Sequence, residues 1–180
     1  MKKEEFDKLS KIDQRKHIAR DVLVRLNNNF TAMTGRYILV PKQAHYSDWE
    51  AKEAQSFAQN DECAVCAKGA IVMSFIAMFN TFSGSDMRKI ISSDNDNGDN
   101  DNVITEIFGK DLWDAVERAY EGWAYEGKDG YKSPVGKFVH VPQYHPTWKD
   151  GYKSPTARLT NIMQEIADTG TMDVYEPYIN

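Results

Sequence analysis

Two cysteines, Cys63 and Cys66, lie three positions apart near the middle of the chain. A Cys-x-x-Cys pair supports thiol–disulfide exchange, or it supplies two thiolate ligands to a soft metal such as zinc. Further along, His140 and His145 have the spacing of a histidine pair in a Cys₂His₂ zinc site. These four residues therefore form a candidate metal set, in which zinc would tie the second half of the chain to the first.

Two other interpretations of the cysteines stay open. A redox pair normally follows a strand in a βαβ unit, and the sequence shows no such unit. The third interpretation is packing, since a cysteine outside a disulfide is among the residue types most often buried. We give packing the most weight.

A second candidate for metal chemistry is the stretch DNDNGDNDN, residues 94–102. Its carboxylates are the hard oxygen ligands that calcium prefers. The EF-hand frame does not fit, because Gly98 at its sixth position puts Ser93 first and Ile104 last. We expect residues 93–102 to form a mobile, acidic, solvated loop, with a calcium site of another kind as the alternative.

A seven-residue peptide occurs twice, as Lys128–Pro134 and as Lys149–Pro155. Asp-Gly favours a turn and Ser-Pro a helix start, so one interpretation is the same turn built twice. The other is a pair of binding loops, each presenting a tyrosine and lysines to an anionic or aromatic partner. Both copies lie in an irregular region rich in Tyr, Lys and Gly, residues 124–153. The binding residues that we predict there are Tyr131, Lys132, Trp148, Tyr152 and Lys153.

The elements that would position these residues are mainly helical. Within residues 63–80, the part from Ala70 to Phe79 is apolar on nearly every side, which predicts a buried central helix starting at Cys63. Helical spacing also predicts a helix that starts near Ser10 or Asp13 and ends at Asn27. Further helices are expected over residues 47–59, 85–91, 103–123 and 155–169.

Local signals set the expected boundaries of these helices. Ser47 with Glu50 resembles a capping box, and Gly109 predicts a break in the helix over residues 103–123. Ser154, Pro155 and Gly170 fit the N-cap, first position and C′ position of the last helix. Residues 37–40 and 137–141 are expected to be strands that pair with each other.

These elements predict a mainly α fold with a small minor β-sheet. We expect one compact domain, residues 1–180, of about five helices around the buried central helix, because a domain takes roughly 100–200 residues.

Composition excludes several functions. The 180 residues carry a net charge of −5 without a basic stripe, so we do not expect a nucleic-acid partner. The longest apolar run, residues 69–79, is too short for a membrane helix of about 20 residues, and no signal peptide is visible. We expect a cytoplasmic protein with no membrane partner.

Two segments carry a loose resemblance to a group of proteins. Cys63–Ala70 and Arg158–Ile166, the second followed by Thr169-Gly170, resemble segments of small uncharacterised phage and bacterial accessory proteins. In that group a Cys-Ala-x-Gly-Ala helix start precedes a C-terminal helix that ends in a glycine turn. The resemblance implies structural roles for the matching residues. It also implies an accessory protein in a host cytoplasm that binds a host factor, including components of antiviral defence.

The sequence contains no strong catalytic signature, Walker loop or GxGxxG motif. Glu117 and Glu121, one helical turn apart, suit a carboxylate site, although solvated helix charge is the commoner explanation. We therefore expect a protein that binds a host macromolecule, with no cofactor. The alternative is an anionic small-molecule (nucleotide) site at Lys132 and Lys153, a zinc- or calcium-binding protein, or a metal-dependent hydrolase.

Overall fold

Helix boundaries in the computed structural model follow the local chemistry of capping residues. The backbone N–H of Asp13 donates to the Ser10 side chain at the start of α2 (Lys11–Leu26), and Asn27 is the C-cap. Ser154 caps the start of α8 (Pro155–Thr169), where Pro155 occupies the first turn. Gly170 ends α8 in the left-handed conformation, with φ 79°. These four boundaries confirm the predictions from sequence.

The structure describes residues 1–34, 38–39, 48–83, 85–86, 103–121, 123–125, 138–140 and 154–172. The other helices in this part of the chain are α1 (Lys3–Phe6), α3 (Ala51–Asn60), α4 (Ala67–Met78), α6 (Val103–Phe108) and α7 (Lys110–Glu121). The strands are β1 (Phe30–Ala32), β2 (Ile38–Leu39), β3 (Cys63–Val65), β4 (Trp123–Tyr125) and β5 (Phe138–His140). The expected loop over residues 93–102 lies outside the described residues.

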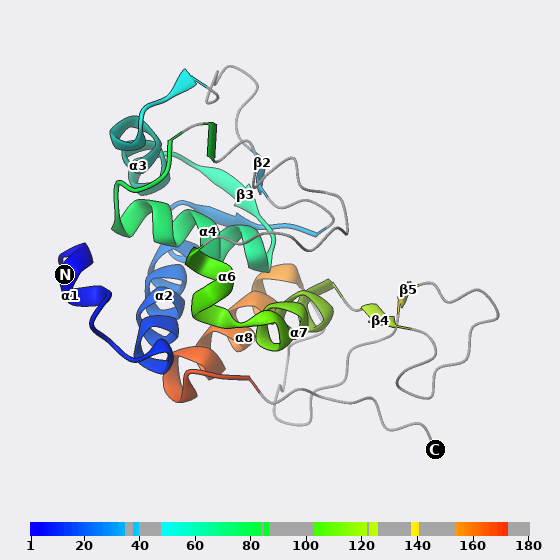
Figure 1. Cartoon of the computed structure of the whole chain (residues 1–180). Helices are drawn as coiled ribbons and strands as arrows, with labels where there is room; N and C mark the ends of the chain where they lie inside the picture. The colour runs from blue at the N-terminus through cyan, green and yellow to red at the C-terminus, as the bar shows by residue number, and fades with distance from the viewer. Residues whose placement is uncertain are drawn as a thin grey trace.

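Helix α4 is the centre of the fold (Figure 1). Its residues from Ala67 to Ala77 are all buried, as expected for a helix that is apolar all round. Helices α2, α3 and α7 pack against it, and α8 packs along α2. The protein is thus a mainly helical single domain with a small mixed sheet of three strands. Within the described residues, none of the helices has the length and apolar character needed to span a membrane.

The central helix begins later than predicted. Cys63 lies in a strand, β3, and only Cys66 is at the helix start, as the N-cap of α4. A short apolar run has no periodicity that distinguishes helix from strand. Whether Cys63–Val65 forms a strand therefore depends on whether other strands are available to pair with it. β3 lies between β1, to which it is parallel, and β2, to which it is antiparallel.

The predicted pairing of the strands near residues 37–40 and 137–141 is wrong. β2 pairs with β3, whereas β5 pairs with β4 in a separate antiparallel sheet, with Trp123 opposite His140. Trp123, expected as the last residue of the helix over residues 103–123, is instead the first residue of β4. Strands adjacent in sequence are the commoner pairs because closing a short loop costs less entropy.

The start of α3 differs from the prediction, whereas the break between α6 and α7 agrees with it. α3 begins at Ala51 rather than near Ser47, which lies outside the described residues, and the Glu53 carboxylate accepts from the backbone N–H of Glu50. The break at Gly109 is confirmed, because Gly109 has φ 73° and separates α6 from α7. A left-handed glycine ends α6 and lets α7 leave in a new direction.

Candidate functional site

The predicted binding residues Tyr131, Lys132, Trp148, Tyr152 and Lys153 all lie outside the described residues. The elements on either side of them are described. β4 follows α7 directly, and the first copy of the repeat lies in the connection between β4 and its antiparallel partner β5. The second copy leads into α8, whose N-cap Ser154 is its sixth residue.

The helices on either side of this region, α7 and α8, contact each other close to where it begins and ends in the sequence. Arg158, in the first turns of α8, donates from Nη1 to the backbone carbonyl of Tyr120 at 2.6 Å. The same guanidinium lies 5.7 Å from the centre of the Tyr120 ring. Tyr120 is in the last turn of α7, and its hydroxyl donates to the Met33 carbonyl at 2.6 Å. The chain that leaves α7 and the chain that enters α8 therefore start from neighbouring positions.

The cysteine pair is buried in the first half of the fold. Both cysteines are reduced, and Cys66 Sγ accepts from the backbone N–H of Gly69 at 3.4 Å. Burial raises the pKa of the Cys63 thiol to about 12, against a smaller opposing effect of Arg25. A raised pKa disfavours the thiolate, which is the form that attacks disulfides and binds zinc. The geometry of Cys63 is that of a packed core residue.

Of the two histidines in the candidate metal set, the structure describes the position of His140 only. His140 is the last residue of β5, which belongs to the β4–β5 sheet and not to the sheet that contains Cys63. His145 lies outside the described residues, as do the carboxylates of residues 94–101. In the part of the chain that is described, no group of three or more His, Cys, Asp or Glu side chains is placed to hold a metal ion. The zinc and calcium sites stay predictions.

A charged residue that the sequence analysis did not single out lies next to the cysteines. Lys68, in the first turn of α4, is only 5% exposed. Its ammonium forms an ion pair with the carboxylate of Glu117 on α7 and lies 5.1 Å from the centre of the Trp113 ring. A lone lysine beside an apolar run was the available signal, since lysine is rarely buried without a partner. Glu117 is thus the partner of a buried cation.

The three arginines of α2 bind the C-terminal ends of other helices, which their spacing in the sequence does not predict. Each donates to a backbone carbonyl in or just beyond the last turn of another helix, where orphan C=O groups carry partial negative charge. The contacts run from Arg15 to Ile107 of α6 at 2.7 Å, from Arg20 to Ala167 of α8 at 3.2 Å, and from Arg25 to Ala58 of α3 at 2.9 Å. α2 thereby ties three helices together through charge-assisted hydrogen bonds.

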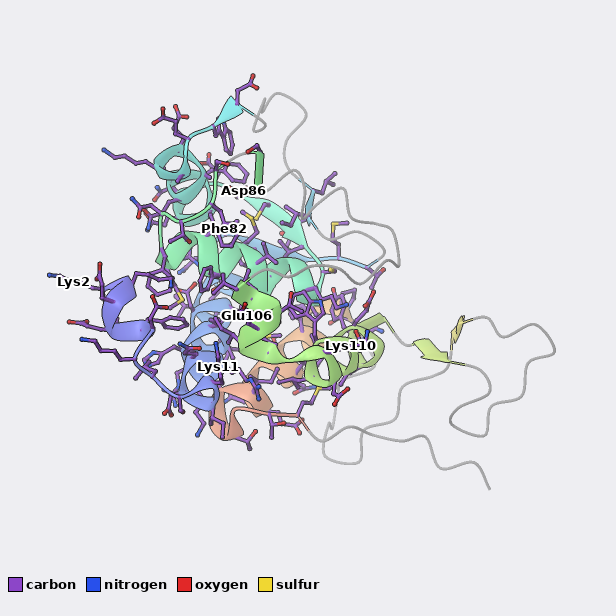
Figure 2. All side chains as sticks on the ribbon, in the orientation of Figure 1. Lys2, Lys11, Phe82, Asp86, Glu106 and Lys110 are labelled. Carbon is purple, nitrogen blue, oxygen red and sulfur yellow. The ribbon has the colours of Figure 1, made fainter. Side chains whose placement is uncertain are left out.

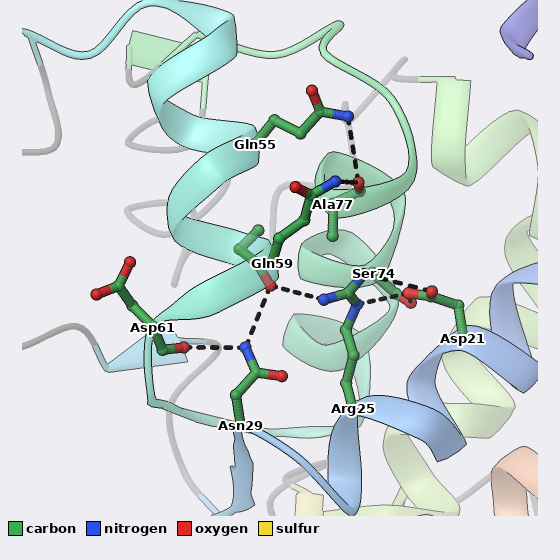
Figure 3. Close-up of polar contacts among 9 residues, drawn as sticks. Asp21, Arg25, Asn29, Gln55, Gln59, Asp61, Ser74 and Ala77 are labelled. Atoms are coloured by element: carbon green, nitrogen blue, oxygen red, sulfur yellow. Dashed lines mark hydrogen bonds and ion pairs between the residues drawn. The ribbon is translucent and has the colours of Figure 1, made fainter.

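Figure 3 shows polar contacts between α2, α3 and α4, including those of Arg25. The Asp21 carboxylate accepts from Arg25 Nε at 2.6 Å and from the hydroxyl of the fully buried Ser74. At the end of α4, the Ala77 carbonyl accepts from the side-chain amides of Gln55 and Gln59. Each of these interactions satisfies a buried or helix-terminal group, which identifies the network as structural.

Comparison of the chain with models of known protein families, with curated proteins and with solved structures gives no match.

Proposed function

We propose that this protein acts by binding a host macromolecule through the chain between α7 and α8, residues 124–153. The single observation behind the proposal is the hydrogen bond from Arg158 to the Tyr120 carbonyl, which joins the two helices on either side of that chain. Both copies of the repeated peptide lie in the sequence between these two helices. Two copies of one binding element on a shared anchor would act at a high effective concentration on one partner.

The distribution of charge supports the same surface. The arginines of α2 and Arg158 are engaged with helix carbonyls inside the domain. The repeats carry lysines and tyrosines at matching positions, Tyr131-Lys132 and Tyr152-Lys153. Tyrosine is enriched at protein interfaces because it combines a large apolar ring with a polar end. An acidic protein surface that accepts both rings and ammonium groups is the partner that this composition fits.

The resemblance to phage accessory proteins supports a host factor, and an antiviral defence component in particular, as that partner. The protein would then inhibit by occupancy and not by catalysis.

Site-specific photo-crosslinking in a bacterial host tests the proposal. A benzoylphenylalanine replaces Tyr131 in one variant and Tyr152 in another, and adducts are identified by mass spectrometry. We expect both positions to crosslink to the same macromolecule. The Tyr131→Ala and Tyr152→Ala changes together should weaken capture of that partner at least about tenfold, because buried interface aromatics often contribute 1–2 kcal/mol each or more.

The matched control is the same crosslinker at Val24, an exposed apolar residue on α2 that belongs to the domain and not to the repeats. It should give none of the adducts seen at positions 131 and 152. The proposal fails if these positions give no adduct above background, or if the Val24 variant captures the same partner.

A further inference from the structure

The N-terminal helix α1 is too short to exist without the rest of the fold. It has four residues, and an isolated helix of that length is not stable in water. Figure 1 places α1 beside the C-terminal end of α4. The Phe6 ring, which is fully buried, packs there against the Phe75 and Phe79 rings at centroid distances of 5.9 and 4.9 Å. Docking of Phe6 is therefore what forms α1.

A cation is held over the same aromatic surface. The Lys3 ammonium lies 6.0, 5.7 and 5.7 Å from the ring centres of Phe6, Phe75 and Phe79. It also forms an ion pair with the carboxylate of Asp7. An ammonium placed near several aromatic rings and a carboxylate is attracted both by the ring quadrupoles and by the opposite charge.

Only one described side-chain hydrogen bond to the α1 backbone comes from the rest of the domain. Gln14 of α2 donates from Nε2 to the Phe6 carbonyl at 3.0 Å. A short helix with few contacts opens at a lower free energy than a core helix, because fewer contacts must break. The described contacts that keep α1 in place are those of the Phe6 ring, the Lys3 ammonium and the Gln14 side chain.

We propose that α1 is an N-terminal strap, closed over the Phe75–Phe79 surface of α4 and held closed by the charge of Lys3. Removing that charge, by substitution or by acetylation of the amine, raises the fraction of molecules in which the strap is open and the two rings are uncovered. The domain itself stays folded, because α4 keeps its contacts with α2, α3 and α7. This device is separate from the binding surface proposed above.

Amide hydrogen exchange measures opening of the strap directly. The reporters are the N–H groups of Phe6, Asp7 and Leu9, which donate to the carbonyls of Lys2, Lys3 and Phe6. Lys3→Met keeps the length of the side chain and removes its charge. We expect the protection factors of the three reporter N–H groups to fall about tenfold in this variant, because it loses several weak cation–π contacts and one ion pair. Lys3→Arg keeps the charge and should stay within about twofold of the wild type.

Two controls separate strap opening from general loss of stability. Lys11→Met makes the same chemical change at an exposed residue of α2, labelled in Figure 2, and should leave the reporters unchanged. The backbone N–H of Gln14, which donates to the Ser10 carbonyl, should keep its protection factor in every lysine variant. The Phe6→Ala variant gives the reference exchange rate for a strap that is fully open.

Three outcomes would overturn the proposal. Lys3→Met could leave the protection factors of the reporters unchanged, or Lys3→Arg could lower them as much as Lys3→Met does. The wild type could also already exchange at the rate of the Phe6→Ala variant, in which case the strap is not closed.

Discussion

The guanidinium of Arg15 donates from Nε to the backbone carbonyl of Ile107, 2.7 Å away in space and 92 residues away in the chain. From Nη1 it also donates to the carbonyl of Gly170 at 3.4 Å. One side chain of α2 thus caps the end of α6 and contacts the residue that ends α8. Burial lowers the pKa of this guanidinium from its ordinary value, which marks the cost of holding the charge there.

Replacing Arg15 tests whether this contact stabilises the domain. Arg15→Met should lower the free energy of unfolding by about 2–3 kcal/mol, because two carbonyls lose a charged donor. Arg15→Lys should recover part of the loss, since one ammonium does not reproduce the planar fork of a guanidinium. Urea denaturation measures both. Lys11→Met, at an exposed residue of the same helix, should stay within about 0.5 kcal/mol of the wild type.

Gly109 and Gly170, both left-handed, should respond differently to the same substitution. A Cβ at Gly170 would lie 2.4 Å from Cγ2 and 3.0 Å from the carbonyl oxygen of Ile12, whereas at Gly109 the nearest atom is Arg15 Nη2 at 3.9 Å. Gly109→Ala should cost about 1–2 kcal/mol from the backbone conformation alone. Gly170→Ala should cost at least about 1 kcal/mol more, from overpacking. Thermal denaturation gives the order, and equal losses would contradict the role of Ile12.

Because the ammonium of Lys68 is buried, removing its partner Glu117 should lower the free energy of unfolding more than removing Lys68 itself. Glu117→Gln should lower the free energy of unfolding by about 1–2 kcal/mol, less than the ~3–5 of a fully buried pair because the Glu117 side chain is half exposed. Lys68→Met should cost less than Glu117→Gln, and the double variant should resemble Lys68→Met alone. Chemical denaturation of the three variants gives this order. A larger loss for Lys68→Met than for Glu117→Gln would show that the cation itself is required.

Cys63 predicts a loss of stability at alkaline pH. Its pKa is raised to about 12 in the folded state, against ~8.5 for a cysteine in an unfolded chain. Between these values the unfolded chain loses its proton while the folded protein keeps it, so stability falls as pH rises through that range. Cys63→Val should show a shallower fall in urea midpoint between pH 8 and pH 10.5, because it removes the titrating group. Identical slopes in the two proteins would show that the Cys63 thiol titrates alike in both states.

Native mass spectrometry of protein purified without chelator tests the metal sets. We expect the mass of the bare polypeptide, because Cys63 is a buried core residue and His140 belongs to a different sheet. One bound zinc, lost in both His140→Ala and His145→Ala, would instead establish the Cys₂His₂ site. Bound calcium that is lost on replacing Asp96 and Asp99 by Asn would establish the acidic segment as its site.

Much of the fold is predictable because its signals are local. Ser10, Ser154 and Gly170 act on backbone groups within one helical turn, so the residue type alone places each boundary. The apolar composition of residues 70–79 likewise requires a buried helix in any mainly helical arrangement. The predicted binding residues stay a prediction from composition and repetition, because they lie outside the described residues.

Tertiary structure decided everything that joins distant parts of the chain. Cys63 became a strand residue only because β1 and β2 provide backbone partners on either side of it. In the sequence, Arg15 and Lys68 look like ordinary charged residues. Only folding places the Ile107 carbonyl next to Arg15 and the Glu117 carboxylate next to Lys68. The sequence by itself determines caps, periodicity and burial, since these depend on neighbours within a few residues. Strand pairing and the partners of buried charges depend on which groups meet after folding, and that is settled by packing of the whole domain.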